Sequence, residues 1–300
     1  MIITACPHGP QSTRHAEGVH RSQFASRQTR PLTPSHTAHG PATPGHVTAL
    51  EPALAGEARA LAARLRLPSA PRADSAWALE VYRREAALPW GLRLRLLGRG
   101  APGPVETDLT GGRLGHRLRR VGRHQDLARA VGLHRSPPGQ VLDLTAGLGQ
   151  DAAVLAGLGC ELLLAERSPV LHALLERGIE HALAAGGEGA RAAARMRLLA
   201  ADALDVLAET VPADAVVYLD PMYPEPAGRG RTAAPRKEMQ VLRAVAGADT
   251  DADALLPAAL EAGARRVVVK RPRLGPPLAG RLPDHRILGR STRFDVYLRR

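Results

Sequence analysis

The chain has 300 residues, a net charge of +12 and a composition that is 44% hydrophobic but only 3% aromatic, so it can bury a sizeable core built mostly from Ala, Leu and Val. No stretch reaches the ~18 consecutive apolar residues of a membrane span, and the first residues lack the apolar run of a secretory signal. Two cysteines, Cys6 and Cys160, cannot make a disulfide framework or a four-ligand zinc site. We therefore expect a soluble, cytoplasmic protein with no membrane association and no metal.

Residues 1–48 are predicted to be a disordered N-terminal extension. They hold six of the twelve histidines, many Ser, Thr, Pro and Gly residues and little hydrophobic periodicity. Such a segment cannot bury enough apolar surface to offset the entropy lost on ordering. A histidine-rich tract is also typical of metal binding, but these histidines lack the i,i+4 pair on a helix that would bind a metal. Val47 begins the first segment with a structured pattern, and we expect the natural polypeptide to start there.

Residues 49–135 are expected to form a small α+β cap that ends in a basic helix. Apolar residues at helical spacing predict a helix from Glu51 to Leu67. The runs Trp77–Tyr82 and Leu92–Leu97 predict strands, and the second alternates Leu with Arg as an edge strand would. The apolar spacing within Arg113–Arg135 predicts an amphipathic helix.

Residues 136–300 change to a pattern in which apolar strands alternate with helices rich in Ala and Leu. The predicted strands are Val141–Leu144, Leu162–Ala165, Leu198–Ala200, Val216–Leu219, and a final pair Val267–Lys270 and Phe294–Leu298. Helices are predicted from Asp151, Pro169 and Ala203, and over Arg236–Val245 and Leu255–Ala262. This alternation predicts an α/β domain whose parallel sheet is covered on both faces. Ligands of such sheets bind beyond the carboxyl ends of the strands.

The first of these strands ends in a loop that is typical of a cofactor site. Gly147 and Gly149 allow the backbone to come close to a ligand. Asp143, just before them, would repel a pyrophosphate but suits a cationic ligand such as S-adenosylmethionine. A dinucleotide site remains an alternative, because residues 147–152 also satisfy the G-x-G-x-x-G/A spacing. A purely structural turn is the other alternative.

Two carboxylates follow the next two strands. Glu166 stands where an acid that binds a ribose should stand, and both candidate cofactors carry that sugar. Asp202 follows the third strand and suits a contact to the edge of an adenine. Its alternative role is the N-cap of the helix that follows.

The fourth strand ends in Asp220-Pro221-Met222-Tyr223-Pro224, which resembles the (Asn/Asp)-Pro-Pro-(Tyr/Phe) motif of amino-methyltransferases. The exocyclic amine of a base is a poor nucleophile because its lone pair is delocalised into the ring. Asp220 can accept a hydrogen bond from that amine and Tyr223 can stack on the base, so we expect both to be catalytic. Alignment of this kind can supply ~7–11 kcal/mol. The alternative is a proline-rich turn.

The block from Asp143 to Tyr297 resembles the small-subunit ribosomal RNA methyltransferase J family, which methylates the guanine N2 at position 1516 of 16S rRNA. The resemblance covers about residues 58–298 and rests on DLTAGLGQD (143–151), LAERSP (164–169), VYLDPMYP (217–224), KEM (237–239), DAD (251–253), VVVKRP (267–272) and RFDVY (293–297). It implies a class I, Rossmann-like fold, S-adenosylmethionine as cofactor, and 16S rRNA or the small ribosomal subunit as partner.

The resemblance also implies a set of cofactor contacts. Together with Asp143 and Gly147 from the loop, they are Gln150, Asp151, Glu166, Arg167, Asp202, Ala203 and Asp220. The chain departs from the family at two of these places, since the family often has Arg where Gln150 stands and Ser-Ser where Asp202-Ala203 stand. The segment Glu225–Pro235 is also longer and richer in Gly and Arg.

The distribution of charge indicates a polyanionic partner. Residues 136–264 carry 10 basic and 18 acidic residues, whereas 113–135 carry 7 and 1, and 265–300 carry 11 and 2. Clustered cations attract phosphates and release counterions on binding. We expect RNA contacts in both flanks, and the candidates are Arg117, Arg120, Lys270 and Arg271. The alternative for these basic residues is a solvated surface without a partner. The alternatives for the whole protein are an amino-methyltransferase acting on another RNA or on DNA, and a non-enzymatic RNA-binding module.

Overall fold

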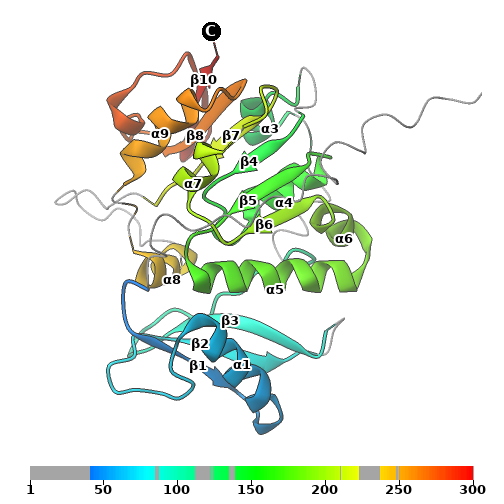
Figure 1. Cartoon of the computed structure of the whole chain (residues 1–300), viewed down its shortest axis with the longest axis vertical. Coiled ribbons are helices and arrows are strands. Elements are labelled where there is room, and N and C mark those ends of the chain that lie inside the picture. The colour runs from blue at the N-terminus through cyan, green and yellow to red at the C-terminus, as the bar shows by residue number, and fades with distance from the viewer. Residues whose placement is uncertain are drawn as a thin grey trace, which may run out of the picture. The chain divides into compact units, whose positions relative to one another are not determined.

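The computed structural model describes residues 41–84, 88–111, 122, 124–134, 139–209, 211–222, 237–247, 249 and 251–299. The N-terminal part of this chain is a three-stranded sheet in the order β1 (Gly45–Ala49), β2 (Trp77–Arg83), β3 (Trp90–Leu96). β1 pairs parallel to β2, and β2 pairs antiparallel to β3. The helix α1 (Ala55–Leu65) connects β1 to β2 (Figure 1). The predicted cap helix and both predicted strands are therefore present, and β3 lies at the edge of the sheet.

The first described residues form structure that the sequence does not predict. β1 starts at Gly45, inside the segment 1–48 that composition assigns to a disordered extension. The buried His46 ring bonds Ser75, and the Trp77 indole donates to the Thr43 carbonyl at 3.0 Å. The expected disorder is therefore wrong for residues 41–48, whereas a natural start at Val47 stays a prediction. A glycine is required at Gly45 because an added Cβ would lie 2.2 Å from the Trp77 ring. Residues 1–40 lie outside the described residues.

The C-terminal part is built on a seven-stranded sheet in the order β6-β5-β4-β7-β8-β10-β9 (Figure 1). The strands are β4 (Val141–Asp143), β5 (Leu162–Ala165), β6 (Met196–Leu199), β7 (Val216–Leu219), β8 (Arg266–Pro272), β9 (His285–Leu288) and β10 (Thr292–Leu298). β4 to β8 pair in parallel, and β10 pairs antiparallel with β8 and β9. The predicted parallel sheet and its final strand pair are confirmed.

Helices cover both faces of this sheet. The described helices of this part are α3 (Asp126–Val131), α4 (Gln150–Gly157), α5 (Pro169–Ala185), α6 (Gly187–Ala193), α7 (Ala203–Ala208), α8 (Lys237–Ala246) and α9 (Ala252–Glu261), and all of them except α8 pack on the sheet. Neighbouring strand residues such as Val141 and Leu142 belong to different hydrophobic clusters, one packed with α3, α4 and α6 and the other with α7 and α9. This alternation is the pattern of a strand that is buried on both sides. None of the described helices is both long and apolar enough to span a membrane.

The cap packs on α5 and α8 through a third hydrophobic cluster, to which Leu79 of β2, Leu174 of α5 and Val241 of α8 belong. The Trp90 carbonyl of β3 accepts hydrogen bonds from the Arg177 guanidinium of α5. The cap therefore shares one hydrophobic core with α5 and α8. Of the predicted basic helix 113–135, the described residues show a helix over 126–131, while residues 112–121, 123 and 135–138 lie outside them.

Candidate active site

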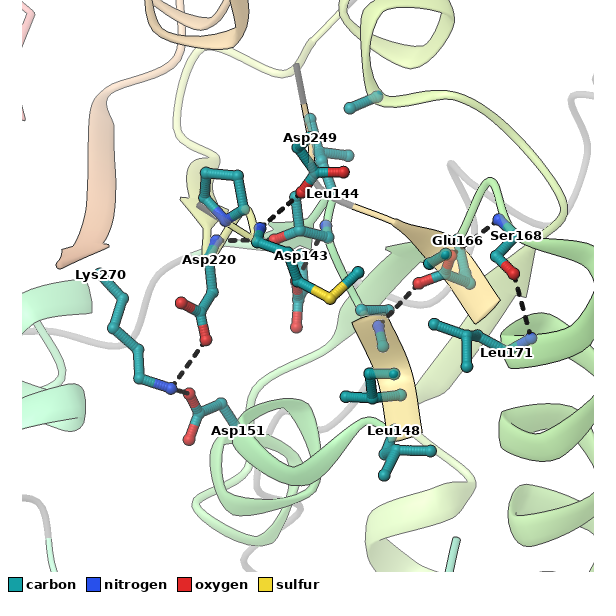
Figure 2. Close-up of a pocket in the computed structure, with 18 of the residues that line it drawn as sticks. Asp143, Leu144, Leu148, Asp151, Glu166, Ser168, Leu171, Asp220, Asp249 and Lys270 are labelled. Atoms are coloured by element: carbon teal, nitrogen blue, oxygen red, sulfur yellow. Dashed lines mark hydrogen bonds and ion pairs between the residues drawn. The ribbon is translucent and has the colours of Figure 1, made fainter. Parts of the chain in front are cut away.

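A cavity of about 800 Å³ opens at the carboxyl ends of the parallel strands (Figure 2). This volume falls within the ~300–1,000 Å³ that small-molecule sites occupy. All nine residues predicted to contact a cofactor line it, namely Asp143, Gly147, Gln150, Asp151, Glu166, Arg167, Asp202, Ala203 and Asp220. They converge because each follows or ends a strand of the same parallel sheet, whose carboxyl ends meet at one edge.

The glycine loop between β4 and α4 forms one wall of the cavity. Gly147 and Gly149 both have positive φ, 53° and 69°. A Cβ added at Gly149 would lie 2.5 Å from Leu175 of α5, whereas a Cβ at Gly147 would meet no atom within 4 Å. Glycine at position 149 therefore allows α5 to pack closely against the loop. Gly147 leaves open space in which a ligand can approach the backbone.

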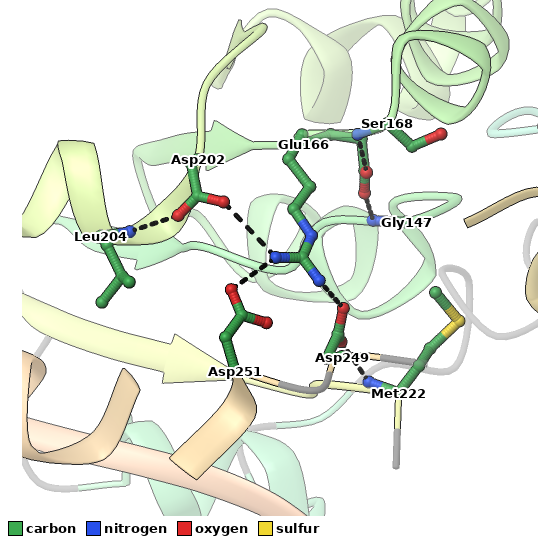
Figure 3. Close-up of polar contacts among 9 residues, drawn as sticks. Gly147, Glu166, Ser168, Asp202, Leu204, Met222, Asp249 and Asp251 are labelled. Carbon is green, nitrogen blue, oxygen red and sulfur yellow. Dashed lines mark hydrogen bonds and ion pairs between the residues drawn. The ribbon is translucent and has the colours of Figure 1, made fainter. Parts of the chain in front are cut away.

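Glu166 fixes the shape of this loop (Figure 3). One carboxylate oxygen accepts from the Gly147 amide at 2.9 Å and the other from the Ser168 amide at 2.8 Å. Burial raises the pKa of Glu166 to about 7, against the two amide bonds that favour its ionised form. Glu166 thus joins the glycine loop to the start of α5, in addition to the ribose contact that the sequence predicts.

Asp143 lies at the end of β4, at the base of the cavity. Its side chain is buried and accepts a hydrogen bond from the Thr145 amide at 3.2 Å. Burial raises the pKa of Asp143 to about 8, and the nearby carboxylates of Asp151 and Asp220 also raise it. A positive charge placed in this part of the cavity would offset the cost of ionising the group.

Lys270 of β8 joins two carboxylates of the cavity (Figure 2). Its Nζ lies 2.8 Å from Oδ2 of Asp151 and 2.8 Å from Oδ2 of Asp220. The Tyr218 hydroxyl also donates to Asp151, at 2.7 Å. The two carboxylates outweigh the effect of burial and raise the pKa of Lys270 well above its ordinary value, so its ammonium stays protonated.

Asp220 faces the cavity at the end of β7, with 40% of its side-chain surface exposed. Its amide donates to the Thr145 hydroxyl oxygen at 2.6 Å, which fixes the end of the strand. Enclosure by the walls of the cavity raises the pKa of the Asp220 carboxyl, and the Lys270 ammonium counteracts that rise.

Three carboxylates, which Figure 3 labels as Asp202, Asp249 and Asp251, form ion pairs with Arg167. Its guanidinium lies 2.7 Å from Asp251, 2.5 Å from Asp249 and 3.5 Å from Asp202. Asp249 also accepts from the Met222 amide, at 2.5 Å, and so ties the segment after β7 to this cluster. The sequence reasoning missed Asp249 and Asp251, although the DAD block that starts at residue 251 was a signal for the second.

The predicted alternative for Asp202 is confirmed, because its carboxylate accepts from the Leu204 amide at 2.8 Å and caps α7. The remaining carboxylate oxygen faces Arg167. No group of three or more His, Cys, Asp or Glu side chains with the arrangement of a metal site occurs among the residues that the structure describes.

The structure describes two of the four residues predicted to contact RNA, Lys270 and Arg271. Lys270 points into the cavity, and Arg271 is only 5% exposed and donates to the Pro276 carbonyl at 2.8 Å. Arg271 also lines the cavity, and its predicted contact with RNA stays a prediction. Arg117, Arg120 and Tyr223 lie outside the described residues.

The chain is similar over most of its length to known methyltransferases. The SAM_MT family model, which describes SAM-dependent methyltransferases, matches residues 60–299. The protein named ribosomal RNA small subunit methyltransferase J from Thioalkalivibrio sulfidiphilus is 48% identical over 244 residues, which cover 80% of this chain and 92% of that relative. The protein of the same name from Pseudomonas fluorescens is 45% identical over 255 residues, covering 84% and 94%.

A solved structure shares the fold. The crystal structure of a SAM-dependent methyltransferase from Neisseria gonorrhoeae matches with a TM-score of 0.60 and 32% identity, and covers 85% of this chain and 96% of that one. The large sheet is accordingly a Rossmann-like methyltransferase fold, and its cofactor is S-adenosylmethionine. The chain belongs to the ribosomal RNA small subunit methyltransferase J family of SAM-dependent methyltransferases.

Proposed function

We propose that this protein transfers a methyl group from S-adenosylmethionine to the exocyclic N2 amine of guanine 1516 in 16S rRNA, in the cytoplasm. The observation that carries the proposal is the position of Asp220. Its carboxylate faces the same cavity as the glycine loop, 2.8 Å from a lysine ammonium that counteracts the rise of its pKa. A hydrogen-bond acceptor for an amine therefore stands beside the site that suits the methyl donor.

The cavity fits this cofactor on its own chemistry. When bound, S-adenosylmethionine supplies a methyl group on a positively charged sulfur. The open space at Gly147 would admit the ligand to the loop, and Asp143 and Glu166 would face its charged and ribose parts. Carboxylates with raised pKa values gain stability when a cation neutralises them, so the donor set suits a sulfonium compound better than a pyrophosphate.

Asp220 would act on the amine of the base. By accepting a hydrogen bond from the NH₂ group, it localises the nitrogen lone pair and aims it at the methyl carbon. The new N–C bond forms as the S–C bond breaks, and the nitrogen then loses one proton. Asp220 can receive that proton because the enclosed cavity raises its pKa, whereas the protonated Lys270 cannot act as a base.

The choice of substrate rests on the relatives and on charge. The relatives' names give small-subunit ribosomal RNA as their substrate, and two of them are 48% and 45% identical to this chain. The segment 265–300 completes the sheet and has six exposed arginines among its described residues, as expected for a protein that binds a polyanion. They are Arg265, Arg273, Arg281, Arg286, Arg290 and Arg299.

The proposal is tested with the purified full-length chain, methyl-labelled S-adenosylmethionine, and small ribosomal subunits or 16S rRNA that lack the modification. Digestion to nucleosides and mass spectrometry should find the label in N2-methylguanosine. Replacement of guanine 1516 by adenine should abolish the incorporation. Label in a different nucleoside, or label that persists after this replacement, would refute the assigned target.

A further inference from the structure

The rim loop, residues 272–276, follows β8 at the edge of the cavity. Pro272 at its start lines the cavity, and so do Ser291 and Thr292 at the start of β10. The Arg273 amide donates to the Ser291 carbonyl at 3.1 Å, which holds the loop against that strand. The rim loop is thus fixed beside the opening through which a substrate would enter.

Two buried arginines hold the backbone of the rim loop. Nη1 of Arg293 donates to the carbonyls of Pro272, Arg273 and Gly275 at 3.0, 3.0 and 2.6 Å. Arg271 donates to the next carbonyl, that of Pro276, at 2.8 Å. Nearly every carbonyl of this short segment therefore has a charged donor, which fixes the conformation of the loop.

Arg293 is itself held by a buried partner. It bonds both carboxylate oxygens of Asp295, at 2.8 and 2.9 Å, and the Asp295 side chain is fully buried. Taking such a pair out of water is unfavourable, and the mutual attraction and the hydrogen bonds must offset that cost. A two-point pair also fixes the orientation of the guanidinium. These residues belong to the RFDVY block, to which the proposed methyl transfer assigns no role.

The rim loop presents a large apolar side chain to water. Leu274 is 95% exposed, the highest value among the exposed large hydrophobic residues of the described chain. A single exposed leucine on a surface is common and carries no meaning by itself. Here, however, the leucine stands on a loop fixed by buried charges at the rim of the active-site cavity. The neighbouring Arg273 is exposed and its guanidinium also donates to the Gly289 carbonyl, and Arg290 is exposed next to Ser291, to which the loop bonds. This combination is suited to a contact with a partner that has both apolar faces and negative charges.

RNA has those properties, and the proposed reaction requires such a contact. The N2 amine can reach Asp220 inside the cavity only if the guanine leaves its stack. Proteins that open stacked bases insert apolar side chains, leucine included, between them. Building on the proposed function, we propose that the rim loop binds the substrate RNA beside the target guanine, with Leu274 inserted between bases and Arg273 facing the adjacent phosphates.

The test compares Leu274→Ala with wild type and with Leu183→Ala, a control in which a half-exposed leucine is removed at the far end of α5. An RNA fragment that spans position 1516 carries 2-aminopurine next to the target guanine. We expect Leu274→Ala to lower kcat/KM for 16S rRNA at least about tenfold and to abolish the fluorescence rise that reports unstacking. Affinity for S-adenosylmethionine should stay unchanged, and Leu183→Ala should match wild type in every measurement.

Wild-type kcat/KM and wild-type fluorescence in Leu274→Ala would overturn the inference while leaving the proposed function intact. A defect seen on assembled small subunits but absent on naked rRNA would also overturn it, because the partner of Leu274 would then be a ribosomal protein. If the wild-type chain fails to methylate guanine N2, the proposed function falls. The 2-aminopurine fluorescence and the affinity of the RNA fragment, measured with each of the two variants, would still decide whether the rim loop contacts RNA.

Discussion

Lys270 and Asp220 form an ion pair inside the cavity, with Nζ 2.8 Å from Oδ2 (Figure 2). Because Lys270 lies on β8 and Asp220 follows β7, the pair bridges two neighbouring parallel strands at their carboxyl ends. The same ammonium holds Asp151 at the start of α4. One cation thus fixes two carboxylates in a site whose enclosure would otherwise favour their neutral forms.

Replacement of Lys270 should alter the pH dependence of the reaction. In Lys270→Met, the pKa of Asp220 loses the cation that lowers it, so the acidic limb of the kcat profile should move to higher pH. At pH 7 we expect a loss of about tenfold or more, since hydrogen bonds to charged groups contribute ~1.5–3 kcal/mol. Lys270→Arg keeps the charge and should restore much of the rate. A pH profile that is unchanged in Lys270→Met would contradict this role.

Removal of the Asp220 carboxylate should affect turnover far more than cofactor binding. We expect Asp220→Ala to lower kcat at least ~100-fold, the scale of losing one preorganised hydrogen-bond partner. Affinity for S-adenosylmethionine, measured by calorimetry, should stay within a few fold of wild type. Turnover at the wild-type rate would refute the assignment of Asp220 to the amine.

The buried carboxyl of Asp143 should make stability depend on pH. Its pKa is about 8 in the folded protein against 3.8 as a free side chain, so the folded state binds more protons than the unfolded state between these values. Stability of the ligand-free protein should therefore fall as pH rises from 5 to 8, on the order of several kcal/mol. In Asp143→Asn the slope of unfolding free energy against pH should be clearly smaller. Equal slopes in urea unfolding of both proteins would show that Asp143 does not cause the dependence.

The glycine at the start of α4 should be needed for folding stability. Gly149→Ala places a side chain at φ 69° and against Leu175, which is fully buried and has little room to move. We expect it to lower the free energy of unfolding by about 1–3 kcal/mol. Gly56→Ala in α1 is the matched control, since a Cβ there meets no atom within 4 Å and its φ is not positive. Thermal unfolding of the two variants checks the difference, and an equal Tm would contradict it.

The strands that the sequence predicts best are those buried on both sides. The predicted strands Leu162–Ala165 and Val216–Leu219 match β5 and β7 at both ends. Each is a continuous apolar run between glycine or proline residues, and such a run defines where a buried strand begins and ends. β9 was missed because Ile287 is its only buried residue, and β1 was missed because its Gly45 and His46 resemble a loop. These edge strands are specified by their pairing partners, which local sequence does not reveal.

The residues of the site were easier to predict than their contacts. The ends of parallel strands converge, so motifs at those ends line one cavity. The partners of Lys270 lie 50 and 119 residues away along the chain, and no local pattern indicates such pairs. The same holds for Arg167 and Asp249, which are 82 residues apart. For this reason the sequence predicts only an RNA contact for Lys270. In the structure its ammonium bonds the carboxylates of Asp151 and Asp220.

Methyl transfer to the guanine N2 is tested most directly with a substrate that lacks this nitrogen. A 16S rRNA, or a fragment of it that wild-type protein methylates, is prepared with inosine in place of guanosine 1516, because inosine differs only in lacking the N2 amine. With labelled S-adenosylmethionine, we expect incorporation into the guanosine substrate and none into the inosine substrate, although both RNAs should bind with similar affinity. Methylation of the inosine substrate at an undiminished rate would contradict transfer to N2.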